Sequence, residues 1–394
     1  MPSKFLLSHL READWLDSAR ARAYLRILFF VQLAGLVILV LAAQGGLDSR
    51  GEPLGTDFVS FWTAARMALS GAPASVYDAA THHAAEQAAF GPALGWYAFF
   101  YPPVFLLYVL PLGALPYFGA LAVWLGGTLA AYAVVLRRFG AGLMPLLAFP
   151  AVLTTLGHGQ NAFLSTALFG GGVLLLSARP FAAGLCFAAL CYKPQLAVLI
   201  PFGLLVAGRW RALAGMVVGG VLLVGAALAA FGWETWRAFF AESALARATL
   251  ELGLVEPEKM QSFFAALRLL GAPLGFAYAA QIALSVAVAA ALALLLRRTR
   301  DEQMQGALMA VAALLVTPFV LDYDLTLLAV PLAVLFAQAR ASSFAPYEKS
   351  ILLVAFMLPA FSRALAQYAH LPLAPLVLVL LFAALARRAW AARA

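Results

Sequence analysis

The sequence predicts an all-α, polytopic integral membrane protein, and two observations carry the prediction. Of the 394 residues, 64% are apolar and only 11% are charged, and the mean hydropathy is +0.91. Soluble globular domains seldom have such a composition. Apolar runs of about 20 residues, long enough to cross roughly 30 Å of hydrocarbon as a helix, recur from Leu25 to the C-terminus. We therefore expect one membrane domain over 1–394, with about twelve transmembrane helices.

Hydropathy places these spans, and one segment needs a separate decision. Segment 101–116, YPPVFLLYVLPLGALP, is apolar, but its four prolines remove backbone donors and break a straight helix. We expect it to be embedded rather than spanning. The expected spans are 25–43, 117–136, 142–157, 161–178, 180–192, 194–207, 212–231, 273–296, 304–320, 325–339, 350–362 and 371–386.

The basic residues support this topology. The chain has a net charge of +8, but its Lys and Arg are dispersed between apolar runs, which argues against a nucleic-acid partner. Lys and Arg favour short cytoplasmic loops. If 101–116 does not span, most of the 26 basic residues fall on one side, together with both termini. We expect a multi-pass protein of the bacterial cytoplasmic membrane with both termini in the cytoplasm.

Two long loops, 44–116 and 232–272, then lie on the outer face. In the first, apolar residues at helical spacing alternate with Ser60, Thr63 and Arg66, so we expect an amphipathic helix in the membrane interface. The second repeats this pattern. The apolar positions are Phe58, Phe61, Trp62, Ala65 and Leu69 in the first loop, and Trp233, Trp236, Phe240, Phe263, Phe264, Leu267 and Leu270 in the second.

Acidic and basic residues near membrane depth are costly, so each needs a reason. In the stretch GTDFVSFWTAARMALSG, Asp57 is the first candidate. With Thr56 it can cap the helix that begins at Phe58, and Gly71 can end that helix. Its place at the outer surface, under a loop long enough to form a lid, equally suits a catalytic carboxylate. The sequence leaves both readings open.

Polar groups from separate turns fall on the same face. GHGQN supplies His158, Gln160 and Asn161 between two apolar runs, which a plain turn would tolerate but not require. CYKPQ supplies Lys193, the only charge between Arg179 and Arg209. Its ammonium could extend to lipid headgroups or serve as the counter-charge of a lipid phosphate.

A third turn, LDYDL, supplies Asp322, Tyr323 and Asp324. Two acids one residue apart suit a sugar or a metal, and a solvated capping loop is the plain alternative. Two carboxylates alone are weak grounds for a hard cation, so metal use stays open, and we expect no other cofactor.

A carboxylate, a lysine and amide or imidazole groups under a lid suggest sugar transfer from a lipid phosphate. The phosphate is already a fair leaving group, so the main requirement is a base for the acceptor hydroxyl. Asp57 would be that base, Lys193 would bind the phosphate, and the remaining polar residues would bind sugar or acceptor. Those remaining residues are His158, Gln160, Asn161, Asp322, Tyr323 and Asp324.

Several motifs in this order resemble glycosyltransferase family 87, the bacterial polyprenyl-phosphate-mannose-dependent mannosyltransferases of the GT-C fold class. The resemblance runs from about Gly55 to Pro331. The motifs are GTDFVSFWTAARMALSGAPASVY, YPPVFLLYVLPLGALP, GHGQNAFL, AGLCFAALCYKPQLAVLIP with RWRAL, and TPFVLDYDLTLLAVP.

The resemblance implies a GT-C-like bundle whose catalytic aspartate falls on Asp57 and whose Lys-Pro lysine falls on Lys193. It also implies a lipid-linked mannose donor and a glycan or glycolipid acceptor. Members of the family carry a His near a Ser-Pro element, whereas this chain has Thr317-Pro318 followed by the LDYDL turn.

Two other classes fit the composition. A transporter or lipid flippase also places polar groups on apolar helices, but such proteins show inverted halves and broken helices at the midplane. Here we find no repeat, and the polar candidates gather at one face. A non-catalytic assembly factor for envelope polysaccharide is the third reading. A phenotype that survives substitution of Asp57 but not deletion of the gene would favour it.

Overall fold

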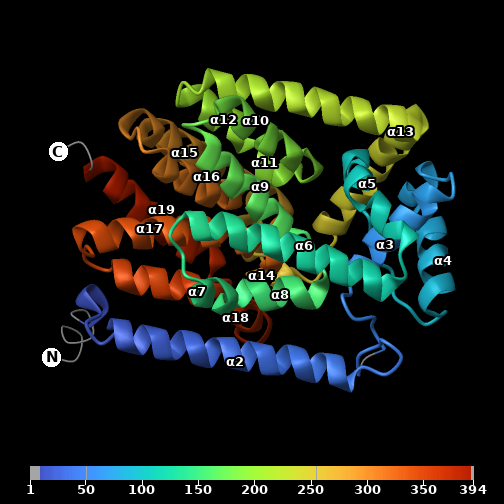
Figure 1. Ribbon diagram of the computed structural model, residues 1–394, viewed down its shortest axis with the longest axis horizontal. Coiled ribbons are helices and arrows are strands. Elements are labelled where there is room, and N and C mark those ends of the chain that lie inside the picture. Colours follow the sequence, from blue (N-terminus) through green and yellow to red (C-terminus); the bar gives the residue numbers. More distant parts are fainter. Residues whose placement is uncertain (1–8, 50, 254, 392–394) are drawn as a thin grey trace.

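The computed structural model describes residues 9–49, 51–253 and 255–391, and within them the chain is built from helices with no named strand (Figure 1). Three isolated bridges are the only β-type pairings among these residues. The helices are α2 (Ser18–Ala42), α3 (Phe58–Leu69), η1 (Ala74–Tyr77), α4 (Ala79–Phe90), α5 (Pro103–Val109), η2 (Leu110–Ala114), α6 (Tyr117–Arg138), α7 (Leu143–Ala148), α8 (Pro150–His158), α9 (Ala162–Leu175), α10 (Pro180–Ala188), η3 (Ala189–Tyr192), α11 (Pro194–Ala197), α12 (Leu199–Val206), α13 (Trp210–Glu251), η4 (Pro257–Lys259), α14 (Phe263–Leu269), α15 (Leu274–Arg298), α16 (Glu302–Val316), η5 (Asp322–Leu328), α17 (Ala329–Ser342), α18 (Glu348–Ala369) and α19 (Ala374–Ala391).

The helices confirm an all-α membrane protein but do not support twelve full spans. Among the described residues, seven helices are long and apolar enough to cross a membrane, where η5 and α17 count as one. Others that hydropathy marks as spans are shorter apolar helices of 10–17 residues. Hydropathy alone overcounted because an apolar run gives the same signal whether its helix is continuous or broken. The seven are α2, α6, α13, α15, η5 with α17, α18 and α19.

The short helices end at polar turns. Helix α8 stops at His158, where Gly159 adopts the left-handed conformation, and α9 resumes at Ala162. Lys193 separates η3 from Pro194, the first residue of α11. Each break therefore places a polar side chain inside the bundle, where the freed backbone groups find protein partners.

Segment 101–116 does not form a full span, in agreement with the sequence-based expectation. It contains α5 and η2, which change from α to 3-10 geometry next to Pro111. Twelve residues from Pro103 to Ala114 give a helix of only about 18 Å. The segment packs on α3 at Gly113, because a Cβ there would lie 2.8 Å from the backbone carbon of Ala65.

Helix α3 is a buried helix, and the expectation that it lies in the membrane interface is wrong. Its Phe58 and Ala65 are fully buried, and the supposedly outward-facing Ser60 and Thr63 are 2% and 3% exposed. An apolar stripe has the same period whether it faces lipid or protein, so the sequence could not decide between them. Of the expected polar side, only Arg66 is exposed.

Segment 232–272, the second of the two long loops expected from the sequence, begins at a kink in α13 and is partly helical. Gly232 has φ 77° and ψ 167°, outside helical values, so the helix changes direction there. The part beyond the kink packs against the first loop, where the rings of Tyr77 and Phe239 lie 5.6 Å apart. The first loop and the part of α13 just beyond Gly232 thus form one cap at the end of the bundle opposite the described chain ends, whereas α14 packs on α15 nearer the middle (Figure 1).

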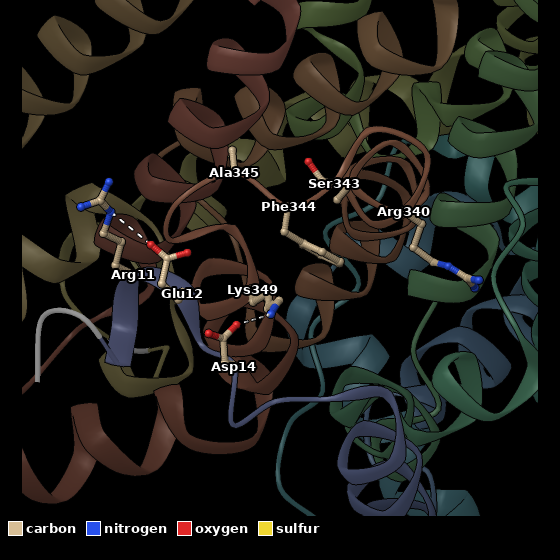
Figure 2. A pocket seen from close by; sticks show the side chains of 9 residues that line it. Arg11, Glu12, Asp14, Arg340, Ser343, Phe344, Ala345 and Lys349 are labelled. Carbon is tan, nitrogen blue, oxygen red and sulfur yellow. Dashed lines mark hydrogen bonds and ion pairs between the residues drawn. The ribbon is translucent and has the colours of Figure 1, made fainter. Parts of the chain in front are cut away.

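Two hydrophobic cores result. One is the helical bundle, with aliphatic residues such as Leu308 and Leu325. The other is the cap, rich in aromatic residues such as Phe58, Phe105 and Tyr192. A charged hollow at the opposite end, lined by Arg11, Arg340, Lys349 and neighbours, lies near the start of α18 (Figure 2).

Candidate active site

The carboxylate of Asp57 lies at the start of α3 and is held by the GHGQN turn. Gln160 Nε2 donates to Asp57 Oδ2 at 2.8 Å. The other oxygen, Oδ1, accepts no hydrogen bond from the described residues, and the side chain is only partly buried. One face of the carboxylate is therefore fixed and the other is open.

Asp57 does not cap its helix. It occupies the N-cap position with φ −65° and ψ −21°, which is already helical, and its side chain accepts no hydrogen bond from the first turn. By contrast, Asp78 at the start of α4 has extended backbone geometry and accepts from Thr81 N. The capping explanation therefore applies to Asp78 and not to Asp57.

A glycine brings the two turns together. Gly159 has φ +65°, and a Cβ there would lie 2.6 Å from Phe58 Cβ and 2.9 Å from Gly55 O. Any larger residue would push the GHGQN turn away from the start of α3. On the far side of Gly159, His158 Nδ1 lies 2.9 Å from Thr56 Oγ1.

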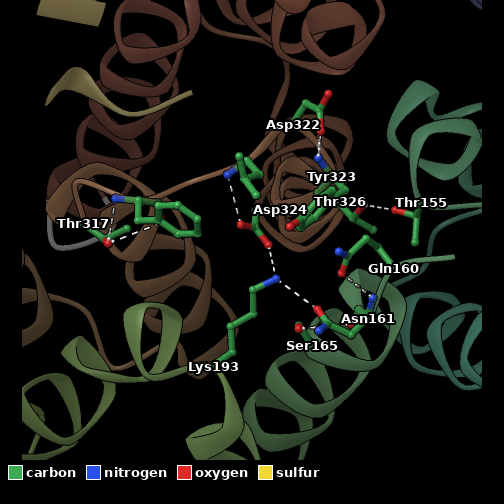
Figure 3. Close-up of polar contacts among 12 residues, drawn as sticks. Thr155, Gln160, Asn161, Ser165, Lys193, Thr317, Asp322, Tyr323, Asp324 and Thr326 are labelled. Atoms are coloured by element: carbon green, nitrogen blue, oxygen red, sulfur yellow. Dashed lines mark hydrogen bonds and ion pairs between the residues drawn. The ribbon is translucent and has the colours of Figure 1, made fainter. Parts of the chain in front are cut away.

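Lys193 is buried and fully engaged by protein groups (Figure 3). Its side chain is 2% exposed and forms an ion pair with Asp324, whose side chain is 1% exposed. Lys193 Nζ also donates to Asn161 Oδ1 at 3.0 Å and lies 5.0 Å from the centre of the Tyr323 ring. The contacts connect three turns that are distant in the sequence.

The two acids of the LDYDL turn have different partners. The Asp324 carboxylate forms an ion pair with Lys193 and accepts a hydrogen bond from the backbone N–H of Leu321. Asp322 accepts from Tyr323 N at 2.8 Å and lies 3.7 Å from Arg363 Nη1. Within the described ranges, no group of three or more His, Cys, Asp or Glu is arranged to hold a metal ion. The sequence left metal use at these acids open.

All eight predicted site residues gather in one region. Gln160 connects Asp57 to this polar cluster, because its Oε1 accepts from the backbone N–H of Asn161 at 3.1 Å. His158 approaches the ring of Tyr323, with centres 6.5 Å apart. Asp322 interacts electrostatically with both His158 and Asp57.

Sequence reasoning missed an ionic network at the outer edge. Arg363, on α18, donates from Nη2 to Glu256 Oε2 at 3.0 Å and also approaches Asp322. The Lys259 hydrogen bond, followed by the charges of Lys259, Arg363 and His158, lowers the pKa of Glu256 despite partial burial. A lone Arg at the end of an apolar run was the available signal.

Two aromatic residues of the first loop were also missed. Tyr101 OH lies 3.4 Å from Gln160 Oε1, and Tyr97 OH donates to Glu52. Burial, and then the Glu52 hydrogen bond, raises the pKa of Tyr97, and the charge of Asp57 adds to the effect. Tyr97 therefore lies near Asp57, on the cap side of the site.

The comparison with protein families decides the class. The sequence model of glycosyltransferase family 87 matches residues 99–318, more than half of the chain. The chain belongs to glycosyltransferase family 87. No curated protein and no solved structure shows a significant match. This family 87 member is a glycosyltransferase with membrane-spanning helices, and the matched region contains Gln160 and Lys193.

Proposed function

We propose that this enzyme transfers a hexose from a polyprenyl-phosphate-sugar donor to a hydroxyl of a glycan or glycolipid acceptor. Mannose is the sugar that the family resemblance implies. The reaction would occur at the extracytoplasmic face of the bacterial cytoplasmic membrane, under the cap, in a GT-C-like bundle.

The observation that carries this proposal is the hydrogen bonding of the Asp57 carboxylate. Gln160 fixes Oδ2, while Oδ1 stays open to an incoming hydroxyl. A carboxylate held in this way is suited to accept a proton from a hydroxyl within hydrogen-bond distance. It does not cap α3, so the start of the helix does not account for this carboxylate.

The reaction would proceed in one displacement. Asp57 takes the acceptor's hydroxyl proton while the oxygen bonds to the anomeric carbon. The bond from that carbon to the phosphate oxygen breaks, and polyprenyl phosphate leaves with the electron pair. Attack opposite to the phosphate inverts the anomeric carbon. Correct positioning of the two substrates supplies a large part of the rate increase.

The remaining polar residues would hold the substrates. His158, which is only partly buried, and Asp322, which lies beside the partly exposed Arg363, would contact sugar or acceptor hydroxyls. Asn161, Tyr323 and Asp324 are buried and would keep Gln160 and the LDYDL turn in place.

The test is transfer of labelled sugar from polyprenyl-phosphate donor by purified wild type and Asp57→Asn, at matched protein levels, with candidate acceptors. Asparagine keeps the shape and an oxygen for Gln160 but cannot serve as a base. We expect a loss of about a hundredfold to ten-thousandfold in the rate. Asp78→Asn is the matched control, because asparagine caps a helix as well as aspartate, and it should stay close to wild type.

Equal rates in wild type and Asp57→Asn would refute the role of Asp57. The same preparation in liposomes separates an enzyme from a flippase. Movement of the lipid-linked sugar across the bilayer, without any glycosylated product, would refute the transfer reaction.

A further inference from the structure

The network at the outer edge of the site contains the one arginine that contacts an acid of the LDYDL turn in the described part of the chain. Arg363 Nη1 lies 3.7 Å from Asp322 Oδ2, and Nη2 lies 3.0 Å from Glu256 Oε2. The side chain of Arg363 is 35% exposed, and that of Glu256 is 54% exposed. Solvent, and thus a ligand, can reach this pair.

Arg363 belongs to the same site as Asp57. Arg363 approaches Asp322 at 3.7 Å, and the ring of Tyr323, the next residue, lies 6.5 Å from that of His158. His158 in turn contacts Thr56, the neighbour of Asp57. These contacts join Arg363 and Asp57 into one polar site, so we place the sugar of the substrate near Asp57 and its phosphate toward Arg363.

Lys193, the cation that the sequence suggests for the phosphate, is less suited to it. Its ammonium is buried and already paired with Asp324 and Asn161. Phosphate binding there would displace the buried Asp324 carboxylate from Lys193 and leave it without its cation, which is costly at a buried position.

We propose that Arg363 binds the phosphate of the lipid-linked donor, and of the polyprenyl phosphate released from it, and that Glu256 occupies this position when no phosphate is bound. The proposal rests on the proposed function. A guanidinium matches phosphate with two parallel N–H donors, and the Glu256 carboxylate presents a similar pair of oxygens.

The local structure permits the exchange. Gln261 N donates to Val320 O at 2.8 Å, and Ser262 Oγ donates to Pro318 O at 2.6 Å. These bonds anchor the second outer loop just after η4. Glu256 precedes the anchor, and its only ion-pair partners among the described residues are Lys259 and Arg363. It can leave Arg363 without disturbing the anchored part of the loop.

The test measures binding of polyprenyl monophosphate to the purified full chain in micelles. The variants are Arg363→Gln, Arg363→Lys and Glu256→Gln. Arg268→Gln is the matched control, because Arg268 is an exposed arginine of the loop that carries Glu256. Thermal unfolding of each variant checks the fold. Polyprenol and inorganic phosphate, added as competitors, separate recognition of the lipid chain from recognition of the phosphate.

We expect Arg363→Gln to weaken binding by about tenfold to a hundredfold, the contribution of a hydrogen-bonded charge pair. Arg363→Lys should bind with an affinity between those of wild type and Arg363→Gln. Glu256→Gln should tighten binding by up to about fivefold, because it removes an exposed competing charge. Inorganic phosphate should compete in wild type and not in Arg363→Gln, polyprenol should not compete, and Arg268→Gln should resemble wild type.

Unchanged affinity in Arg363→Gln would overturn the inference. A loss of affinity in Glu256→Gln as large as that in Arg363→Gln would also overturn it, because it would mean that the ion pair only maintains the local structure. If wild type transfers sugar and Arg363→Gln keeps the same donor KM, only the inference fails. If wild type neither binds polyprenyl phosphate nor transfers sugar from it, the proposed function fails with it.

Discussion

The inner and outer halves of the site contain similar ion pairs in opposite environments. The inner pair, Lys193 with Asp324, is at most 2% exposed on either side. The outer pair, Arg363 with Glu256, is 35% and 54% exposed. Burial makes the inner pair costly to break and so fixes three chain segments. Exposure makes the outer pair weak and exchangeable, which suits a group that must bind and release a ligand.

Breaking the inner pair should have the largest effect. Lys193→Met leaves the Asp324 carboxylate buried without its cation, and we expect a loss of about 3–5 kcal/mol in the free energy of unfolding. Denaturant titration in mixed micelles measures it. Adding Asp324→Asn to Lys193→Met removes the unpaired charge and should recover most of the stability. A Lys193→Met variant as stable as wild type would show that the pair has no structural role.

The next largest effect is expected at Gly159, where the GHGQN turn meets the start of α3. Gly159→Ala places a Cβ against Phe58 and Gly55, so we expect a loss of stability beyond the about 1–2 kcal/mol that a left-handed alanine costs. Gly208→Ala is the matched control, because Gly208 has φ +68° and open space around its Cβ position. The difference between the two variants, measured by the same titration, isolates the close approach.

Equal destabilisation by the two alanine substitutions would show that the turn tolerates displacement from α3. If the contact matters as we expect, Gly159→Ala should also lower sugar transfer, because Gln160 would move with the turn and lose its hold on Asp57. Gly208→Ala should leave the transfer rate unchanged.

The smallest effect is expected at the outer edge. Lys259→Gln removes one charge that contacts Glu256 at 2.9 Å, and we expect less than about 1 kcal/mol of stability to be lost, since both groups are partly exposed. High salt should remove this small difference. A loss as large as that of Lys193→Met would contradict the contrast between the two halves.

Much of the site was predictable because membrane depth makes polar residues expensive. His158, Gln160, Lys193 and Asp324 interrupt apolar runs, and the structure brings all four together. Their partners were not predictable in the same way. No local pattern says that Lys193 pairs with Asp324 or that Gln160 reaches Asp57, since these contacts join segments over a hundred residues or several helices apart.

The fold shows the same limit. The helical class follows from composition, and hydropathy ends a span at 231, next to the kink that the structure has at Gly232. The burial of α3 does not, because it depends on the close approach of Gly113 to Ala65, which is a contact between distant segments. Arg363 was missed because its place in the site depends on contacts with Glu256 and Asp322, which are distant from it in the sequence.

The short helices around the site also bear on the surrounding bilayer. Helices α10 and η3 together cover only Pro180–Tyr192 and expose Phe181 and Leu185; they measure about 20 Å, against roughly 30 Å of hydrocarbon. Where such helices meet lipid, hydrophobic mismatch draws the headgroup region inward or thins the membrane. In the proposed reaction, such thinning would shorten the distance that the donor headgroup travels from the membrane surface to Arg363 and Asp57.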